Sequence, residues 1–358
     1  MSSRLGDAVL DPALWPAIME DISRAVGATG ATLLQADVRT PDVPHTEGLA
    51  ELFKAYFQGN WHIGDIRARG APLLASGAKL VITDYDSVTA EEMRDTAYYN
   101  DLLRPFGFRW FAAVGFRAGS ALWGLSLHRT ARQGLFEGDE LNYLEELTPR
   151  LSNAATLSLA VGRSVLSGIT NALDLVGQPA LILDRSGGVL ATNARADRLF
   201  DDDIRLQNRR IVVKDSRARI NLDTLFAWVR NTAEPASIPI KTIVVRRQLG
   251  QPVLIRVLPI PPSARSAFVG ARVLLTLVPS ALPPDISANL LIEAFELTSA
   301  EAKLGVLIGR GATLHAAAEQ LGVTISTVRN QLKGVFLKTT THRQSELAIL
   351  LSRFLVPR

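Results

Sequence analysis

The chain has 358 residues, of which 47% are hydrophobic and 21% are charged, and it contains no cysteine. This length predicts two or three domains, and the lack of cysteine excludes disulfides, thiolate catalysis and cysteine-ligated zinc. No apolar run approaches the roughly 20 residues that a membrane-spanning helix needs, and no signal-peptide pattern follows Met1. We therefore expect a soluble, cytoplasmic protein that has no membrane partner.

Charge is distributed unevenly, although the formal net charge is only +4. Residues 324–358 carry six Lys or Arg against one acidic residue, Glu346, whereas residues 291–323 carry two basic and four acidic side chains. A solvated helix face does not require such an excess, but binding to a phosphate backbone does. The pattern favours nucleic acid as a partner.

Helical and strand patterns alternate in the first part of the chain. Residues 11–26 have apolar side chains at helical spacing, and a helix is expected over about 138–159. Residues 109–119 and 120–129 predict an antiparallel hairpin around an Ala-Gly-Ser turn. With AYYNDLLRPFGFRW before the hairpin and GLFEGDELNYLEELTPRLSNA after it, residues 1–165 resemble a GAF-like sensory domain.

The middle of the chain shows a different order of elements. ALILD and VLATN predict two short strands joined by a tight turn, NLDTLFAWVRN predicts a helix, and IKTIVVRR, PVLIRVLPI and ARVLLTLV predict three more strands. In this order residues 166–280 resemble a PAS domain. PSALPPDIS then indicates a linker, assigned to residues 281–290.

The C-terminal part, residues 291–358, carries the signals of a helix-turn-helix. Thr298 and Glu301 form a capping-box pattern, and Gly322 suits the turn between two helices. On the second helix one face is apolar and another is cationic, without a carboxylate. Such a face suits base edges and phosphates. The apolar face has Val328, Leu332, Val335 and Phe336, and the other face has Ser326, Arg329, Asn330 and Lys333.

The stretch LTSAEAKLGVLIGRGATLHAAAEQLGVTISTVRNQLKGVFLKTTTHRQSELAILL resembles the DNA-binding domain of LuxR-type regulators along its whole length. A sigma-factor-type helix-turn-helix shares the Thr-Val-Arg run and is the narrower alternative. Gln331 and Thr340 depart from the family pattern, which more often has histidine and glycine there. The resemblance implies an all-α domain of four helices, contacts with double-stranded DNA, and dimerisation through the last helix. The DNA contacts are expected from Thr324, Ser326, Thr327, Arg329, Asn330, Lys333 and Lys338, and the dimer contacts from Leu347, Leu350, Leu351 and Phe354.

The whole chain is therefore interpreted as an α+β multidomain protein, with two α/β sensory domains of antiparallel sheets and helices before the helical domain. We expect a homodimeric one-component transcriptional regulator, with a small-molecule effector or a partner acting on the sensory domains. No cofactor, metal site or enzymatic activity is expected, because no catalytic or metal-ligand spacing is found. The alternative is an enzyme or interaction scaffold to which the helix-turn-helix is appended as a DNA tether. A ligand pocket is expected from Tyr56, Trp61, Asp65, Tyr85, Trp110 and Trp123, with a packed aromatic core as the alternative.

Overall fold

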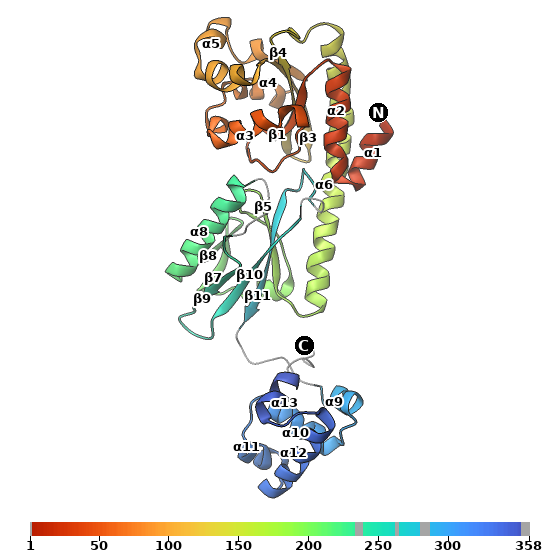
Figure 1. Cartoon of the computed structure of the whole chain (residues 1–358), viewed down its shortest axis with the longest axis vertical. Coiled ribbons are helices and arrows are strands. Elements are labelled where there is room, and N and C mark those ends of the chain that lie inside the picture. The colour runs from red at the N-terminus through yellow and green to blue at the C-terminus, as the bar shows by residue number, and fades with distance from the viewer. Residues whose placement is uncertain (1, 233–238, 262–264, 280–286, 352–358) are drawn as a thin grey trace. The chain divides into compact units, whose positions relative to one another are not determined.

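The computed structural model describes residues 2–232, 239–261, 265–279 and 287–351. The chain forms two compact units (Figure 1). The first unit is mixed α/β and consists of Met1–Leu173 and Pro179–Val278. The second consists of Asp174–Gln178 and Pro279–Arg358, and its described elements are helices. This agrees with the expected mixed α/β part followed by a helical part.

A four-stranded antiparallel sheet organises the beginning of the first unit, in the order β1-β4-β3-β2. The predicted hairpin is confirmed, with Gly119 at a φ of 62° in its turn, where glycine has no steric penalty. The strands are β1 (Gly30–Gln35), β2 (Val81–Thr83), β3 (Phe108–Ala118) and β4 (Ala121–Thr130).

Helices cover both faces of this sheet. On one face, α2 (Trp15–Ala25) and α6 (Asp139–Leu175) share a core with alternate side chains of the strands. The helix α1 (Ser2–Leu10), which has no sequence-based prediction, adds Leu5 and Ala8 to that core. The opposite face is covered by shorter elements: η4 (Ile66–Gly70), α3 (Ala50–Gln58), α4 (Ala71–Ala75), α5 (Ala90–Asp95) and the π-helix η6 (Tyr98–Leu103).

A second sheet has five strands in the order β6-β5-β11-β10-β9. All five strand runs that the sequence predicts are present, and α8 (Ser216–Asn231) packs Leu222, Leu225 and Val229 into the core of this sheet. The strands are β5 (Ala180–Asp184), β6 (Val189–Thr192), β9 (Thr242–Val245), β10 (Val253–Pro259) and β11 (Ala271–Pro279), and a short helix α7 (Ala194–Asp197) follows β6. A further hairpin of β7 (Ile204–Gln207) and β8 (Arg210–Val213) has no sequence-based prediction.

The two sheets of the first unit are joined by one core and by one helix. The helix α6 runs for 37 residues past both sheets (Figure 1), so the boundary expected at 165/166 falls inside it. A Cβ at Gly162 would lie 2.5 Å from Val269 Cγ2, so glycine permits this close approach. Trp15 also packs edge-on against Phe268, with 5.1 Å between ring centroids.

An ion pair near this shared core connects a loop of the first sheet with the second sheet. Asp42 lies between β1 and α3, and its Oδ2 is 3.3 Å from Arg272 Nη1 and 3.9 Å from Arg185 Nε. The Asp42 side chain is only 2% exposed. Burial raises its pKa, but the charges of Arg185 and Arg272 outweigh burial and lower the pKa below its ordinary value.

The second unit has five helices among its described residues, one more than the resemblance implies. The additional helix is α9 (Ala288–Phe295), which begins within the expected linker 281–290; residues 281–286 lie outside the described chain. The apolar residues Leu291, Leu304, Ile308, Val328 and Leu347 meet in one core. The other helices are α10 (Ser299–Gly309), α11 (Leu314–Leu321), α12 (Ile325–Thr339) and α13 (Gln344–Leu351). Among the described residues, no helix is both long enough and apolar enough to cross a membrane.

Candidate nucleic-acid interface and buried cavity

The turn between α11 and α12 has the local geometry that its sequence predicts. Gly322 adopts a left-handed conformation with φ at 65°, which ends α11 and directs the chain into α12. Thr324 is the N-cap of α12, and its Oγ1 accepts a hydrogen bond of 3.2 Å from the Thr327 amide. Hydroxyl contacts of 2.8 Å join Thr324 to Ser326 and Thr327. Three of the expected DNA contacts therefore form one polar cluster at the start of α12.

The two faces of α12 differ as the sequence predicts. Val328 and Val335 are fully buried in the core of the second unit. Arg329, Asn330 and Lys333 are exposed, and within the described residues no hydrogen bond or ion pair engages their side chains. Their donors and charges are therefore available to a partner outside the chain.

Lys338 has a different environment from the other cations of α12. Its Nζ is 2.7 Å from Glu301 Oε2 and 3.0 Å from the carbonyl oxygen of Glu296. The hydrogen bond from Lys338, followed by that from the Thr298 amide, lowers the pKa of Glu301. The sequence predicts that Lys338 contacts DNA, but in the structure its ammonium group joins α12 to the start of α10.

The expected dimerisation residues divide into several environments. Leu347 and Leu351 are fully buried in the core of their own unit, so a dimer surface cannot be built from their side chains in this conformation. Leu350 is half-buried, and Phe354 lies outside the described residues. The helical spacing identifies an apolar face of α13, but the core of the same chain already covers that face. Dimerisation stays a prediction.

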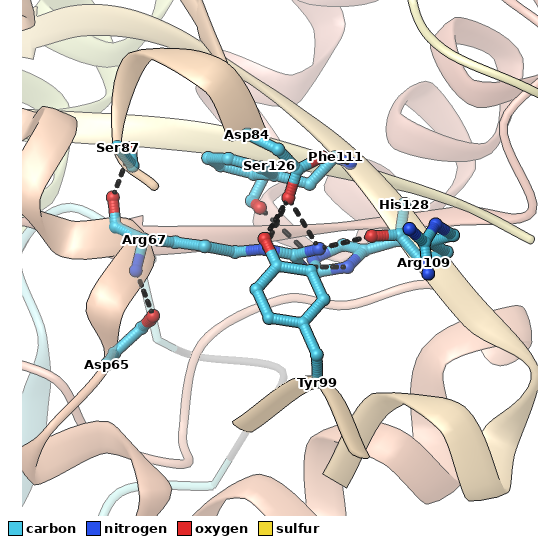
Figure 2. A network of polar contacts seen from close by, with 9 residues as sticks. All are labelled: Asp65, Arg67, Asp84, Ser87, Tyr99, Arg109, Phe111, Ser126 and His128. Carbon is cyan, nitrogen blue, oxygen red and sulfur yellow. Dashed lines mark hydrogen bonds and ion pairs between the residues drawn. The ribbon is translucent and has the colours of Figure 1, made fainter. Parts of the chain in front are cut away.

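A network of polar groups is buried beneath the first sheet, with Arg67 at its centre (Figure 2). Arg67 lies on η4 and is 4% exposed. Its Nη2 is 2.9 Å from Asp84 Oδ1 and donates a 2.8 Å hydrogen bond to the carbonyl oxygen of Arg109. Asp84 also accepts hydrogen bonds from the Tyr99 hydroxyl and from the Phe111 amide. Burial lowers the pKa of Arg67, but Asp84 and Tyr99 outweigh that effect, so the guanidinium stays charged.

His128 on β4 connects this network to the sheet, and its neighbours determine its tautomer. Arg67 Nη1 lies 3.4 Å from His128 Nδ1, and a guanidinium can only donate, so Nδ1 must accept. Burial, followed by the charge of Arg67, lowers the pKa of His128 well below its ordinary value. The neutral ring therefore carries its proton on Nε2 and donates to Ser126 Oγ, 3.1 Å away.

A cavity of about 100 Å³ lies between the same face of the sheet and the helices that cover it. This volume is several times what one water molecule needs. Its wall is mainly apolar, with aliphatic side chains from β1, α3 and the π-helix. One polar cluster in this wall consists of Arg39, Tyr56 and Asp65: Arg39 donates to both partners, and Tyr56 donates to Asp65 over 2.9 Å. Lining residues include Thr32, Leu34, Leu52, Phe53, Leu74, Ile82, Tyr98, Leu102, Ser126 and His128.

Only some of the residues predicted for a ligand pocket line this cavity. Tyr56 and Asp65 line it. Trp123 borders it, but its ring packs against Phe268 at 5.1 Å in the core shared with α2. The cavity lining does not include Trp61, Tyr85 or Trp110. Trp61 packs edge-on against Tyr98, and Tyr85 and Trp110 lie against each other.

Several polar residues of the wall have no sequence-based prediction, among them Arg67, Tyr98, Ser126 and His128. A signal is present in the predicted hairpin, because Ser126 and His128 alternate with Leu125 and Leu127, so polar side chains occupy one face of a strand. Both polar residues are nevertheless buried, which requires partners on a covering layer. No group of three or more potential metal ligands gathers anywhere in the described chain.

Comparisons with known proteins give only distant similarities. No protein-family model and no curated protein matches the chain. Among solved structures, a phage VqmA-DPO complex covers 55% of this chain and 94% of its own, at 16% identity and a TM-score of 0.22. The Escherichia coli DhaR(N)-DhaL complex covers 78% and 86%, at 15% identity and a TM-score of 0.25. A Vibrio cholera VqmA-ligand-DNA complex covers 54% and 90%, at 14% identity and a TM-score of 0.21. Similarities this low assign neither a family nor a function.

Proposed function

We propose that the chain is a one-component transcriptional regulator that binds double-stranded DNA through α12 of a LuxR-type helix-turn-helix. The observation that carries this proposal is the exposed cationic face of α12. Arg329, Asn330 and Lys333 are solvent-exposed and uncommitted within the described chain, while Val328 and Val335 hold the opposite face in the core. Arginine, asparagine and lysine side chains provide the donors that base edges and phosphates accept.

In this proposal the first unit has a regulatory role and is not an enzyme. Its GAF-like part holds a cavity with a few polar groups in an apolar wall, the usual form of a small-molecule site. An effector in that cavity, or a partner protein, would shift the protein between states to which it binds unequally. The regulator would act as a homodimer on a partly palindromic site, which places two recognition helices about 34 Å apart.

Binding of the full-length protein to a random-sequence duplex at several salt concentrations tests the DNA-binding proposal. We expect the logarithm of the binding constant to fall linearly with the logarithm of salt concentration. Lys333→Ala should weaken binding and reduce that slope by about 0.9 for each phosphate that the lysine neutralises. Lys303→Ala, which removes an exposed cation from α10, is the matched control and should leave the slope unchanged. Binding that is indifferent to salt would contradict the proposal.

A further inference from the structure

The charged side chains around the cavity are already matched within the protein. Arg39 pairs with Asp65, and Arg67 pairs with Asp84 behind the wall. His128 is neutral, because burial and the neighbouring guanidinium both disfavour its protonation. A charged ligand would bring an unmatched charge into a buried site, which is strongly unfavourable. The wall therefore selects for neutral molecules.

Two hydroxyl groups at the wall have hydrogen-bonding capacity that the chain does not use. Ser126 Oγ accepts from His128 Nε2, and within the described residues its own hydrogen has no acceptor. Tyr98 is 7% exposed, and its hydroxyl likewise has no hydrogen bond in the described part of the chain. Burial, followed by the charge of Asp65, raises the pKa of Tyr98 well above its ordinary value, so its hydroxyl keeps its proton. Both groups are therefore donors.

We propose that this cavity binds a small, neutral, mainly apolar molecule that presents a hydrogen-bond acceptor, such as a carbonyl oxygen, to the hydroxyls of Ser126 and Tyr98. Cavities of this order of volume accommodate about one small ring. The rest of the wall, which includes Leu34, Leu52 and Leu102, contacts the apolar part of the ligand. The inference deepens the effector role proposed above and rests on it only for the link to regulation.

Three probes of one size class test this chemistry with the full-length protein, by calorimetry in the absence of DNA. Cyclopentanone carries a carbonyl acceptor, methylenecyclopentane replaces the oxygen with CH₂, and cyclopropanecarboxylate carries a charge on the same number of non-hydrogen atoms. We expect both neutral probes to bind and the carboxylate to bind at least about tenfold more weakly than the ketone, because its charge is unmatched. Tighter binding of the carboxylate, or no binding of either neutral probe, overturns the proposal.

Two variants assign the donors. In Tyr98→Phe and in Ser126→Ala, the ratio of the ketone Kd to the alkene Kd should rise about three- to tenfold, the effect of one neutral hydrogen bond. Tyr98→Phe keeps the ring that packs against Trp61, so the alkene Kd should stay unchanged and report an intact cavity. Tyr85→Phe is the matched control, because that tyrosine is 56% exposed and outside the cavity lining.

An unchanged ratio in both variants overturns the assignment of the two hydroxyls. A rise in either variant supports a donor at that position, and a rise in the Tyr85→Phe control contradicts the assignment. No DNA is present in these measurements, so their failure leaves the DNA-binding proposal standing. Failure of the salt-dependent duplex binding would, in turn, leave the ligand chemistry intact.

Discussion

Gly334 on α12 lies against the carboxylate of Glu301 on α10. A Cβ at position 334 would stand 2.5 Å from Glu301 Oε1, closer than real Cβ contacts come. Glu301 cannot move away freely, because its Oε2 accepts hydrogen bonds of 2.7 Å from the Thr298 amide and 2.7 Å from Lys338 Nζ. A glycine in the interior of a helix, which costs about 1 kcal/mol relative to alanine, thus has a packing reason in this chain.

Gly334→Ala should therefore fail to stabilise α12. The gain of about 1 kcal/mol in helix propensity is offset by displacement of Glu301 from its capping and ion-pair contacts, which are worth a similar amount. In a Glu301→Ala background the clash is absent, and the same substitution should increase the local unfolding free energy by about 1 kcal/mol. Hydrogen exchange of the α12 amides in the full-length protein measures both effects. An equal effect in the two backgrounds would show that Glu301 is not the obstacle.

Thr340 ends α12 in a left-handed conformation, with φ at 54°. A β-branched residue is disfavoured there by about 1–2 kcal/mol, whereas glycine adopts this conformation without steric cost. We expect Thr340→Gly to raise the unfolding free energy of the second unit by about 1 kcal/mol, measured by hydrogen exchange in α12. His342→Gly is the control, because His342 is not among the residues with positive φ. Glycine there only raises the conformational entropy of the unfolded chain and should destabilise the second unit. A loss of protection in Thr340→Gly would contradict the argument.

Much of the fold follows from local sequence patterns, and the strands of the second sheet are the clearest case. ALILD at 180–184 and ARVLLTLV at 271–278 are short apolar runs bounded by turn residues, and both are strands in the structure. The length of α6 could not be read in the same way: the sequence predicts a helix over about 138–159, which ends before Gly162, whereas α6 continues to Leu175. Glycine at position 162 within α6 has a reason in the close approach of Val269, more than 100 positions away in the sequence. Tertiary contacts of this kind have no local signal.

In the candidate site, too, one part could be predicted from the sequence and another could not. The faces of α12 follow from helical periodicity, which predicts the exposure of Arg329 and Lys333 that the structure has. The burial of Arg67 has no such signal, because its partner Asp84 lies on a different 3₁₀ turn and arginine is rarely buried without a partner. The neutral state of His128 depends on that same guanidinium. Such a network is defined by the layer that covers the sheet and not by any one segment.

Removal of one partner of the buried pair of Asp42 and Arg272 should strongly destabilise the first unit. Asp42→Asn leaves a buried guanidinium without its counter-charge, and breaking such a pair costs about 3–5 kcal/mol. Chemical denaturation followed by tryptophan fluorescence reports on this core, because Trp15 and Trp123 are both 1% exposed within it. Asp37→Asn, in the exposed part of the same loop, is the control and should change stability by less than about 0.5 kcal/mol. Equal effects of the two substitutions would argue against a role for the pair.

Stability of the first unit should also depend on pH through His128. Burial and the charge of Arg67 lower the folded-state pKa of His128, whereas an unfolded histidine titrates near about 6.5. Below that pH the unfolded state binds a proton that the folded state does not, so stability is fully present above about pH 6.5 and falls as the pH drops. The expected slope from this group is about 1.4 kcal/mol per pH unit.

Denaturation of the wild type and of His128→Gln between about pH 5 and 7.5 isolates this contribution. The difference in unfolding free energy between the two proteins should shrink as the pH falls, because only the wild type loses the stability that depends on a neutral His128. His315→Gln, at an exposed position of α11, should keep the wild-type slope. Parallel pH profiles for the wild type and His128→Gln would contradict a buried neutral imidazole.

One loop of the first unit is held at two positions within four residues, one at the cavity wall and the other at the second sheet. Arg39 is bound to Tyr56 and Asp65 at the cavity wall, and Asp42 is bound to Arg272 in the second sheet. Because coupling between two sites is reciprocal, any ligand that displaces Arg39 and thereby loosens Asp42 must itself bind more tightly when that ion pair is removed. For such a ligand, the affinity of the cavity would measure how firmly the second sheet holds this loop.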